Sequence, residues 1–319
     1  FNEVKNYLPS SYLENYKIFL KNHKKIFKKK RLFIGSYSIQ FDDCFKIFFA
    51  ESRSNGSRYI LAEHGAGIHA SRDVIYDHFY KVSDKVVCPS RKAIKKKKHT
   101  YVGLDIFKKL DLKKEKMKNS KILVNFHEFS KFVFRTPVTN PPFSVEVENF
   151  KKTIEGFKLL SNKRKKNLKF RVKGHYGLNS KQRFAKVFGK NSIENIESID
   201  YTNSLKESKL VVCFIPQTSY IECLYNNIPT ILIGNKTGFF DTSKRLKILK
   251  GLKKNNLYFD NMEQAANFIN KNWNSIDAWW NSKNLQKFIK EFLMENYDIS
   301  ENNYGLMKKL IKTELNKIV

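Results

Sequence analysis

The chain has 319 residues, of which 41% are hydrophobic and 14% aromatic, enough for the cores of two ordinary domains and too many for a disordered chain. Its apolar runs fall short of the ~18–20 residues of a membrane span. The first residue is Phe1, which indicates a processed or truncated start, and no signal-peptide pattern is visible. The four cysteines form no CxxC pair, which predicts reduced, buried thiols in a cytoplasmic protein.

A large positive charge sets this chain apart from an average globular protein. Its 61 Lys and Arg residues against 30 Asp and Glu residues give a net charge of +31, which favours acidic partners. Nucleic acid, an anionic membrane face and phosphorylated substrates all fit that charge. Part of it also fits a proteome biased toward Lys and Asn codons, because Lys far outnumbers Arg. Much of the charge lies in the runs Lys24–Lys25, Lys28–Arg31, Lys95–Lys98 and Lys163–Lys166.

The first third of the chain alternates amphipathic helices with short apolar strands. Apolar residues recur at helical spacing over residues 10–30, and a second helical pattern covers residues 42–55. Further patterns predict strands at 31–36, 59–62 and 82–88 and a helix at 73–80. This order of strand, helix and strand implies right-handed crossovers and a parallel sheet.

A second set of elements follows a charged stretch at residues 108–120, which lacks an apolar face and is predicted to be the interdomain linker. Beyond it, the same patterns again predict strands that alternate with helices. The strands are 122–126, 168–172, 210–215 and 229–234, and the helices are 145–161, 205–208, 220–226, 262–271, 275–296 and 300–317.

The stretch around His64 is the first candidate for a ligand site. The predicted strand 59–62 leads into His64, Gly65, Ala66 and Gly67. Glycines at the carboxyl end of a parallel strand let the backbone approach an anion, and His64 would lie at the lip of a phosphate-sized hollow. A structural turn with a hydrogen-bonded histidine fits the same residues equally well.

Two other functions for this stretch are disfavoured. A serine hydrolase with an oxyanion loop of this kind needs a G-x-S-x-G elbow, which the chain lacks. His64, His69 and His78 match no standard ligand spacing and have no cysteine pair to support them. We therefore predict no metal site.

A second candidate site follows the predicted strand 168–172. Arg171 and Lys173 alternate on one side of the strand end, and Gly174, His175 and a further glycine follow. Two cations beside a glycine loop suit a phosphate or a carboxylate. Solvated charges on an edge strand are the alternative reading.

A third candidate site lies where the strand 210–215 gives way to a helix. Thr218 and Ser219 would begin that helix, and hydroxyls with free N–H groups at a helix start form a ready anion site. Glu222 lies one turn further on, where it could accept hydrogen bonds from ribose or sugar hydroxyls. The alternative is a capping box of Ser219 with Glu222, or of Thr218 with a neighbour, and the ligand and capping readings can hold together.

These stretches together resemble a bacterial family of surface-carbohydrate transferases. That family is related in layout to the GT-B glycosyltransferases and, more distantly, to the CDP-glycerol glycerophosphotransferases. The residues that carry the likeness are Leu8–Glu14, His64–Gly67, Val82–Lys85, Phe170–Arg171, His175–Gly177, Lys209–Val212, Thr218, Glu222 and Asn227–Thr230. The likeness covers most of the chain but matches the C-terminal part of a longer pattern, so we expect an N-terminal portion of the first domain to be missing or reduced.

The resemblance implies an α/β fold with two Rossmann-like domains that face a cleft. The expected organisation is an N-terminal acceptor-side domain over residues 1–115, a nucleotide-donor domain over 116–285, and C-terminal helices over 286–319 that return toward the first domain.

By the same resemblance, the chain would transfer a sugar unit from a nucleotide-activated donor during surface-polysaccharide synthesis. His64 would be the general base or a phosphate ligand, with Asp84 as a weaker alternative base, and the loop glycines Gly65 and Gly67 would bind substrate. The nucleotide would be held by Arg171, Lys173, His175, Thr218, Ser219 and Glu222. No metal or other cofactor is implied besides the donor as co-substrate.

The expected partners are the nucleotide-sugar donor, a lipid-linked or saccharide acceptor, and the anionic inner face of the membrane, with the protein in the cytoplasm. No specific nucleic acid is expected, because the basic runs are scattered and match no recognition motif. A nucleic-acid or polyanion-binding protein and a catalytically inactive GT-B-like module are the alternatives.

Overall fold

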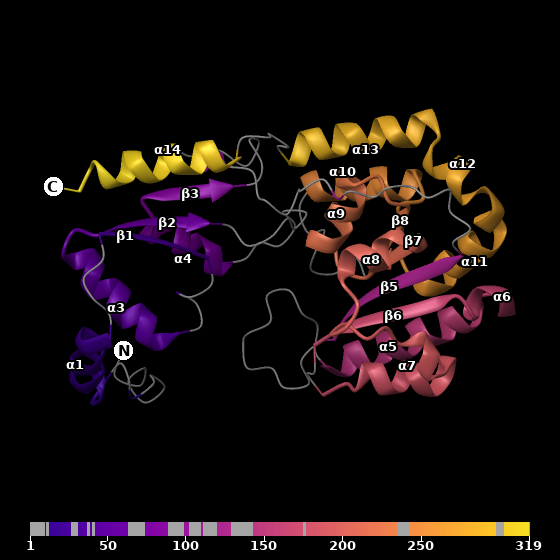
Figure 1. The fold of residues 1–319 in the computed structure, drawn as a ribbon, viewed down its shortest axis with the longest axis horizontal. Helices are drawn as coiled ribbons and strands as arrows, with labels where there is room; N and C mark the ends of the chain where they lie inside the picture. The colour runs from indigo at the N-terminus through magenta and orange to yellow at the C-terminus, as the bar shows by residue number, and fades with distance from the viewer. Residues whose placement is uncertain are drawn as a thin grey trace. The chain divides into compact units, whose positions relative to one another are not determined.

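The computed structural model describes two compact α/β units (Figure 1). Unit 1 comprises Phe1–His64, Ile75–Leu104 and Asn296–Val319, and unit 2 comprises Gly65–Val74 and Asp105–Glu295. The residues that the structure describes are 10, 13–26, 31–36, 39, 42–62, 74–88, 99–101, 110, 120–128, 143–174, 177–234, 243–297 and 303–318. No helix among these residues is long and apolar enough to cross a membrane.

Unit 1 is built on a parallel sheet whose strands follow each other in chain order. The strands are β1 (Leu32–Gly35), β2 (Arg58–Ala62), β3 (Lys85–Cys88) and β4 (His99–Tyr101), in the order β1-β2-β3-β4. Helix α3 (Asp43–Ser54) connects β1 to β2, and α4 (Val74–Val82) connects β2 to β3. Right-handed crossovers that all step in the same direction place their helices on one face of the sheet.

The C-terminal helix covers the other face of this sheet. Tyr59 and Leu61 of β2 pack into a core with Phe49 of α3 and Phe79 of α4. Ile60, between them in the sequence, points the opposite way and packs with Leu310 of α14 (Asn303–Leu315). Figure 1 shows α14 lying along the sheet on the side away from α3 and α4. Helix α1 (Tyr16–Ile26) packs beside α3.

Unit 2 has a five-stranded parallel sheet in which the strand order reverses. The strands are β5 (Lys121–His127), β6 (Leu168–Lys173), β7 (Ser208–Cys213), β8 (Thr230–Ile233) and β9 (Tyr258–Phe259), and their order is β6-β5-β7-β8-β9. The chain steps from β5 to one side for β6 and then returns past β5 to β7. This arrangement is that of a doubly wound Rossmann-like sheet with a switch point between β5 and β7.

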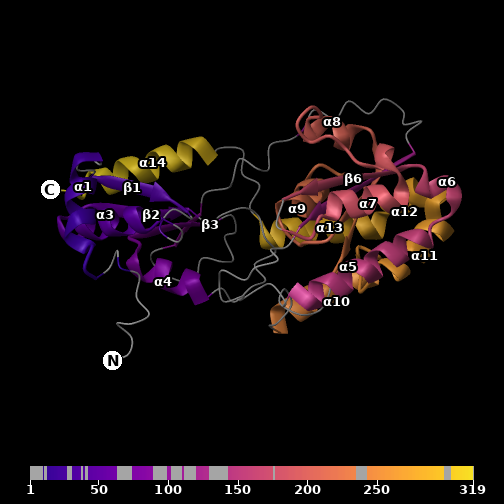
Figure 2. The ribbon, with the colours of Figure 1, turned by 90° about the horizontal axis from the view of Figure 1, so that it is seen from below.

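Helices cover both faces of the sheet of unit 2 because its crossovers step in both directions. On one face, α5 (Phe143–Lys158), α7 (Ser180–Phe188) and α11 (Met262–Asn272) enclose an aromatic core. On the other face lie α8 (Tyr201–Lys206) and α9 (Thr218–Tyr225), which Figure 2 shows from a second direction. The remaining described helices of this unit are α6 (Asn162–Lys165), η5 (Lys190–Ser192), α10 (Ser243–Lys254), η6 (Trp273–Ser275), α12 (Ile276–Trp280) and α13 (Lys283–Asn296).

The two Rossmann-like α/β units confirm the fold class expected from the sequence. Three predicted elements are wrong in detail. The helix expected around 205–208 ends at Lys206 because Ser208 begins β7, and the strand expected over 82–88 begins at Lys85 because Val82 ends α4.

The helix expected over 275–296 is broken into η6, α12 and α13. The break falls at Asn281 and Ser282, where Asn281 ends α12 with an N–H bond to the Asp277 carbonyl. Helix α13 belongs to unit 2 and α14 to unit 1, so the chain returns to unit 1 later than the expected boundary at residue 286.

Candidate functional site

The switch point of unit 2 gathers the loops that follow its central strands. Ligands of open parallel sheets bind outside the carboxyl ends of the strands, at the point where the strand order reverses. At this point β5 ends at His127, and β7 ends at Cys213 beside it. The segment after β7 leads directly into α9, which begins at Thr218. Two of the sequence-predicted ligand residues, Thr218 and Ser219, are therefore placed at the switch point.

The amino end of α9 has no side-chain cap. Its N-cap residue is Gln217, whose side chain makes no capping hydrogen bond. Ser219 lies inside the first turn, so the capping box predicted for Ser219 and Glu222 is wrong. The N–H groups of a helix start carry partial positive charge and attract anions. Glu222, one turn along, is half-buried, and burial raises the pKa of its carboxyl.

Lys173 and His127 lie side by side at the same edge of the sheet. They are the last residues of β6 and β5 and are paired in register. Burial lowers the pKa of His127, the Lys173 ammonium lowers it further, and Glu128 acts in the opposite direction. His127 is therefore a neutral imidazole near pH 7, beside an exposed cation. Our sequence analysis missed His127, although it ends the first strand of unit 2.

A buried carboxylate holds the glycine loop that follows β6. Glu128 is 2% exposed, and its Oε1 accepts the N–H groups of Leu178 at 2.8 Å and Asn179 at 3.2 Å. Its Oε2 accepts the Ser180 N–H at 2.9 Å. Gly174 and Gly177, at the two ends of the loop, have φ values of 102° and 99°, which favour glycine. These contacts fix residues 178–180, at the start of α7, against the carboxyl end of β5.

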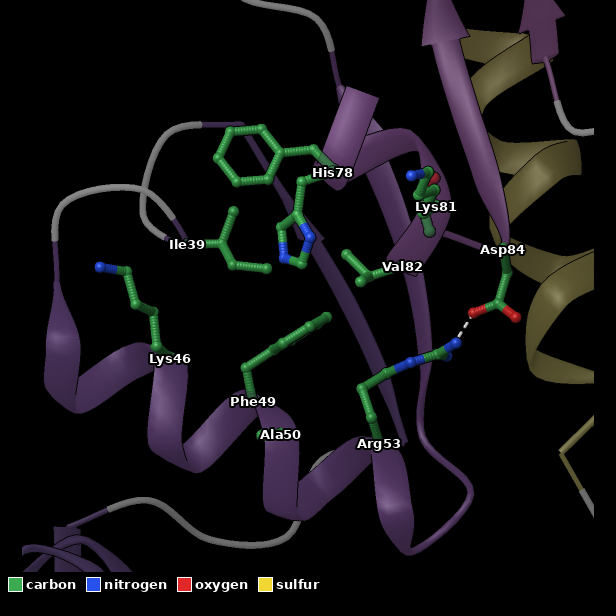
Figure 3. Close-up of a pocket in the computed structure, with 11 residues that line it drawn as sticks. Ile39, Lys46, Phe49, Ala50, Arg53, His78, Lys81, Val82 and Asp84 are labelled. Carbon is green, nitrogen blue, oxygen red and sulfur yellow. Dashed lines mark hydrogen bonds and ion pairs between the residues drawn. The ribbon is translucent and has the colours of Figure 1, made fainter. Parts of the chain in front are cut away.

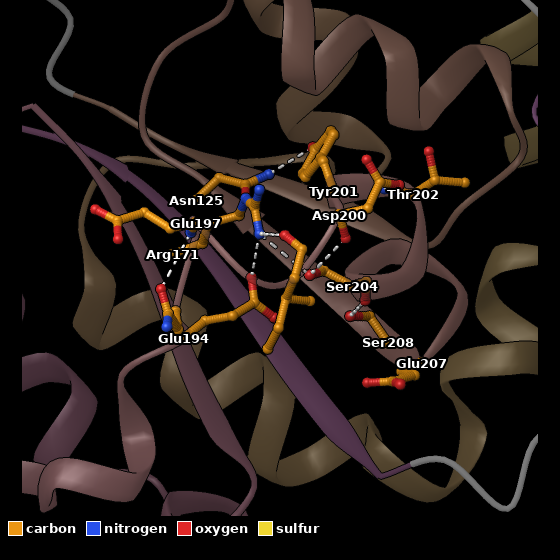
Figure 4. Close-up of polar contacts among 12 residues, drawn as sticks. Asn125, Arg171, Glu194, Glu197, Asp200, Tyr201, Thr202, Ser204, Glu207 and Ser208 are labelled. Atoms are coloured by element: carbon orange, nitrogen blue, oxygen red, sulfur yellow. Dashed lines mark hydrogen bonds and ion pairs between the residues drawn. The ribbon is translucent and has the colours of Figure 1, made fainter.

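Arg171 is placed in a network that ties the segment before β7 to the sheet (Figure 4). Its Nη1 contacts Glu194 Oε2 at 2.8 Å and the Ile199 carbonyl at 3.1 Å, and its guanidinium lies 5.3 Å from the centre of the Tyr201 ring. Glu194 is 2% exposed and also pairs with Lys121 at 2.8 Å. A guanidinium already neutralised by a buried carboxylate is poorly placed to bind a phosphate. We therefore correct the prediction that Arg171 holds the nucleotide.

The same network continues through Asn125 on β5 and Tyr201 on α8 to the helix α9, which follows the switch point. Asn125 Nδ2 donates to the Tyr201 hydroxyl at 2.8 Å, and that hydroxyl lies 4.0 Å from Cys223 Sγ on α9. Burial is the largest of the causes that raise the pKa of Tyr201 well above its ordinary value, so the phenol stays neutral. This buried polar layer fixes α8 and α9 against the strands.

Asp84 lies at the wrong end of its sheet to serve as the alternative base. It directly precedes β3, and its Oδ2 accepts the Tyr59 N–H at 2.7 Å. It pairs with Arg53, and its Oδ1 lies 3.5 Å from Arg58. These contacts are at the amino ends of the strands, opposite the edge that follows β2. Asp84 therefore has a structural role, which corrects the sequence-based hypothesis.

Four other predicted residues, His64, Gly65, Gly67 and His175, lie outside the described residues, so their roles stay predictions. Among the residues that are described, no group of three or more His, Cys, Asp or Glu side chains is placed to hold a metal ion.

Parallel sheets in two Rossmann-like units place the protein in the GT-B-like fold class. The chain belongs to the LIC12162 family of transferases, with a match over residues 3–311. This confirms the resemblance to a bacterial transferase family. No curated protein matches the chain.

Solved structures of similar fold agree with this class. One is the wall teichoic acid polymerase TagF, in a variant soaked with CDPG, with a TM-score of 0.52 and 10% identity over 94% of this chain and 85% of that one. Another is a protein described as a putative UDP-N-acetylglucosamine 2-epimerase from Listeria monocytogenes, with a TM-score of 0.51 and 11% identity over 94% of this chain and 80% of that one. At these identities the likeness is one of fold.

Proposed function

We propose that this transferase moves a sugar or sugar-like unit from a nucleotide-activated donor to a hydroxyl acceptor during surface-polymer synthesis. The observation that carries the proposal is the uncapped start of α9 at the switch point of unit 2, with Lys173 at the same carboxyl edge of the sheet. Membership of a transferase family supports it, and so does a fold shared with a teichoic acid polymerase.

The donor diphosphate would bind at this edge of unit 2. The N–H groups and hydroxyls of Thr218 and Ser219 supply hydrogen bonds, and the Lys173 ammonium supplies charge. Negative charge grows on the leaving phosphate as the bond to the sugar breaks, so donors fixed in this geometry stabilise the transition state more than the ground state. Glu222 would accept from a donor hydroxyl.

The acceptor is proposed to be a lipid-linked or free saccharide hydroxyl, deprotonated by His64. A neutral imidazole near pH 7 can take that proton, which is typically worth ~10²–10⁴-fold in rate. His64→Ala should lower turnover by about that factor and move the melting temperature little. His64→Asn separates the roles, because Asn can donate a hydrogen bond to phosphate but cannot act as a base. Recovery of most activity in His64→Asn would assign His64 to phosphate binding, and a large drop in melting temperature in His64→Ala would make it structural.

Calorimetry with CMP, CDP, UDP and GDP tests the donor site directly. We expect one clear binder, and we expect Lys173→Gln to weaken it by about fivefold to tenfold, as for the loss of one charge-assisted contact. Lys152→Gln is the matched control, because Lys152 is an exposed lysine on α5 that pairs with Glu148 alone among the contacts in the described part of the chain. Failure of all four nucleotides to bind a folded sample would overturn the proposal.

Contact with the anionic inner face of the membrane is a further part of the proposal, and the net charge of +31 supports it. Each basic residue near such a surface contributes ~1 kcal/mol. Sedimentation with anionic vesicles should weaken with salt and with Lys→Glu changes in the runs Lys28–Arg31 and Lys95–Lys98. Equal sedimentation with neutral vesicles would count against it, and tighter binding of duplex DNA than of vesicles would favour the nucleic-acid alternative.

A further inference from the structure

One side of helix α10 exposes lysines, and the helix contains no acidic residue. Leu246, Lys247, Lys250 and Lys254 are all exposed, and at about 100° per residue they fall within an arc of roughly 100° around the helix. The three lysines make no ion pair or hydrogen bond with another described residue. Leu246 is 46% exposed, whereas Leu252 on the opposite side is buried. Helix α10 therefore presents three lysines and one large apolar side chain to solvent.

Helix α13 exposes a stripe of the same composition. Lys283, Lys287, Lys290 and Met294 are exposed, and the same helical geometry places them within an arc of roughly 60°. Met294 is 66% exposed. Lys287 lies 3.9 Å from Glu291, but the two side chains are 77% and 61% exposed, and a pair of this kind is weak. The other two lysines make no ion pair or hydrogen bond within the described part of the chain.

The two helices are antiparallel neighbours within unit 2. Gly251 of α10 faces Phe288 of α13 so closely that a Cβ atom on the glycine would lie 2.8 Å from the ring. Trp279, just before α13, donates its Nε1–H to the carbonyl of Asn255, just after α10, at 3.3 Å. The carboxyl end of α10 thus lies beside the amino end of α13. From there the contact continues backward along α10 and forward along α13 to Gly251 and Phe288, so the helices run in opposite directions.

This geometry turns both stripes to the same side of the helix pair. Seen down each helix from its amino end, the stripe lies counter-clockwise from the contact at Gly251 and Phe288, by roughly 90° in α10 and roughly 130° in α13. In antiparallel helices, equal turns of this kind lead to one common side. Three lysines from each helix then face two acids of α13, Glu291 and Glu295, which lie on the side of its stripe toward α10. We call this the α10–α13 surface, which consists of Leu246, Lys247, Lys250, Lys254, Lys283, Lys287, Lys290 and Met294.

The α10–α13 surface differs from sites where the fold neutralises its own cations. Arg53 is paired with Asp84 in unit 1 (Figure 3), and Arg171 is paired with the buried Glu194 in unit 2. The lysines of the α10–α13 surface have no such carboxylate beside them, with the exception of Lys287. Their charge is therefore available to an anionic partner.

The exposed apolar side chains indicate which anionic partner fits. Leu246 and Met294 gain from a partner that removes them from water as well as supplying negative charge. A lipid surface does both, because lysine stems carry their ammonium groups to the head groups while apolar side chains enter the boundary with the acyl chains. The backbone of a nucleic acid supplies phosphates to lysines but no apolar layer. The composition of the α10–α13 surface therefore favours lipid.

We propose that the α10–α13 surface docks unit 2 on an anionic lipid surface. The inference rests on the membrane contact proposed above and adds to it a surface in unit 2, besides the basic runs of unit 1. The lysines bind the head groups, and Leu246 and Met294 enter the layer beneath them. Each lysine that reaches the head groups should tighten binding by about fivefold, the ratio that corresponds to ~1 kcal/mol.

Sedimentation of the full chain with vesicles tests the lysines. Phosphatidylcholine alone is the neutral surface, and its mixture with phosphatidylglycerol is the anionic one. Lys250→Gln with Lys290→Gln, one change on each helix, should weaken binding to the anionic vesicles by about fivefold per charge. Lys152→Gln with Lys158→Gln on α5 is the matched control, because it removes the same charge from exposed lysines that already pair with acids, and it should change binding by less than about twofold.

A second pair of changes separates lipid from other polyanions. Leu246→Gln with Met294→Gln keeps the charge and removes the apolar side chains, so binding to anionic vesicles should weaken by about fivefold or more. Binding of a short duplex DNA should stay within about twofold of the parent, because it depends on charge. Both positions are exposed, so the far-ultraviolet spectrum and the melting temperature should match those of the parent. Unchanged vesicle binding in this variant, or an equal loss of vesicle and DNA binding, would overturn the proposal.

The remaining outcomes distinguish this inference from the proposed function. Equal weakening by the α5 control and by the change of Lys250 and Lys290 would show that only net charge matters, and would overturn the inference. A loss confined to Lys→Glu changes in the runs Lys28–Arg31 and Lys95–Lys98 would place the membrane contact on unit 1 alone, which overturns the inference and leaves the proposed function in place. Failure of the parent to bind anionic vesicles would overturn both the inference and the membrane contact, while nucleotide calorimetry still tests the transfer site by itself.

Discussion

The two units use the same parallel strands and crossovers, but they close their cores in different ways. In unit 2 the strand order reverses at β5 and β7, so its own crossovers cover both faces of the sheet. In unit 1 the order is sequential, and the face left open is covered by α14 from the far end of the chain. Both faces of the sheet of unit 2 are thus covered by helices that connect its own strands. In unit 1, one face of the sheet depends on a helix that follows unit 2 in the chain. The reversal that closes unit 2 also creates the switch point at which we propose that the donor binds.

The two units also differ in how they bury charge. Unit 2 buries Glu194 under its sheet edge between Lys121 and Arg171. Unit 1 buries Glu314 of α14, which is 0% exposed and lies 2.6 Å from Arg58 on β2. The ion pair of unit 1 therefore joins segments 256 residues apart. Removal of one partner from such a pair leaves a buried charge uncompensated, which is destabilising. A mutation in either pair should therefore lower the stability of the unit that contains it.

Unfolding experiments can follow the two units separately. All three tryptophans, Trp273, Trp279 and Trp280, lie in unit 2, so their fluorescence reports on unit 2 alone. Far-ultraviolet circular dichroism reports on the helices of both units. Urea titrations followed by both signals therefore assign a loss of stability to one unit.

The largest effect is expected from Phe170→Ala in the core of unit 2. The Phe170 ring stacks on Phe184, with ring centres 4.1 Å apart and planes at 14°, and both side chains are fully buried. Truncation of a buried Phe typically costs about 3–5 kcal/mol. We expect the transition in tryptophan fluorescence to move to lower urea concentration, with a loss of about 3–5 kcal/mol in the free energy of unfolding of unit 2. The circular-dichroism phase that belongs to unit 1 should keep its midpoint. A parallel shift of both phases would show that the units unfold together and would break the comparison.

Much of this core could be predicted from the sequence, because strands buried on both faces are continuous apolar runs. The predicted strands 122–126 and 229–234 contain such runs, at 122–124 and 231–233, and both runs lie in strands of the structure. The reversal of strand order could not be predicted, because local patterns contain no information on which strands are neighbours. The partner of Arg171 is Glu194, 23 residues away in an irregular segment, so Arg171 looked like a free cation. Asp84 was misassigned for the same reason, since Arg53 and Arg58 meet it only in the folded sheet.

The second effect is expected in unit 1, from Glu314→Ala. Arg58 would lose the carboxylate that fixes α14 to the sheet. The cost in stability is reduced because Arg58 keeps Asp84 as a partner and its own side chain is 24% exposed. We expect unit 1 to lose about 2–3 kcal/mol, somewhat less than the ~3–5 kcal/mol typical of a fully buried pair. The circular-dichroism transition of unit 1 should move to lower urea concentration, and the transition in tryptophan fluorescence should keep its midpoint.

Glu148→Ala on α5 is the control for Glu314→Ala, because the Glu148 side chain is 65% exposed and should shift neither phase by more than ~0.5 kcal/mol. The pH dependence gives a second check. Burial raises the pKa of Glu314, but hydrogen bonds from Lys317 and Arg58 outweigh it, so the net pKa is lowered. The stability that Glu314 supplies is then present above its unfolded pKa and is lost as the pH falls through the folded value. An unchanged acid limb in Glu314→Ala would contradict this role.

A third, smaller effect concerns the carboxyl edge of the sheet of unit 2, where we propose that the donor binds. Glu128→Gln keeps an acceptor for the loop after β6 but replaces the carboxylate charge that receives three backbone N–H groups. We expect a loss of about 1–2 kcal/mol in the tryptophan transition, in the range for hydrogen bonds to charged groups. If the loop helps to bind the donor, nucleotide affinity should fall by more than stability predicts. Unchanged affinity with lowered stability would confine Glu128 to the fold.

The smallest effect is expected from Glu146, in the first turn of α5. Burial raises the pKa of its carboxyl to about 7. The folded state therefore holds a proton that the unfolded state has already released, so Glu146 costs nothing below the unfolded pKa of about 4.5 and destabilises unit 2 increasingly as the pH rises toward 7. Glu146→Gln removes this titration. We expect it to stabilise unit 2 by about 1 kcal/mol at pH 8, reduced from the full linkage value because the group is partly solvated, and to leave stability at pH 4 unchanged. Tryptophan-monitored urea titrations at the two pH values measure the difference. A gain at pH 4 equal to that at pH 8 would mean that Gln improves packing, and no gain at either pH would mean that the carboxylate of Glu146 is solvated in the folded chain.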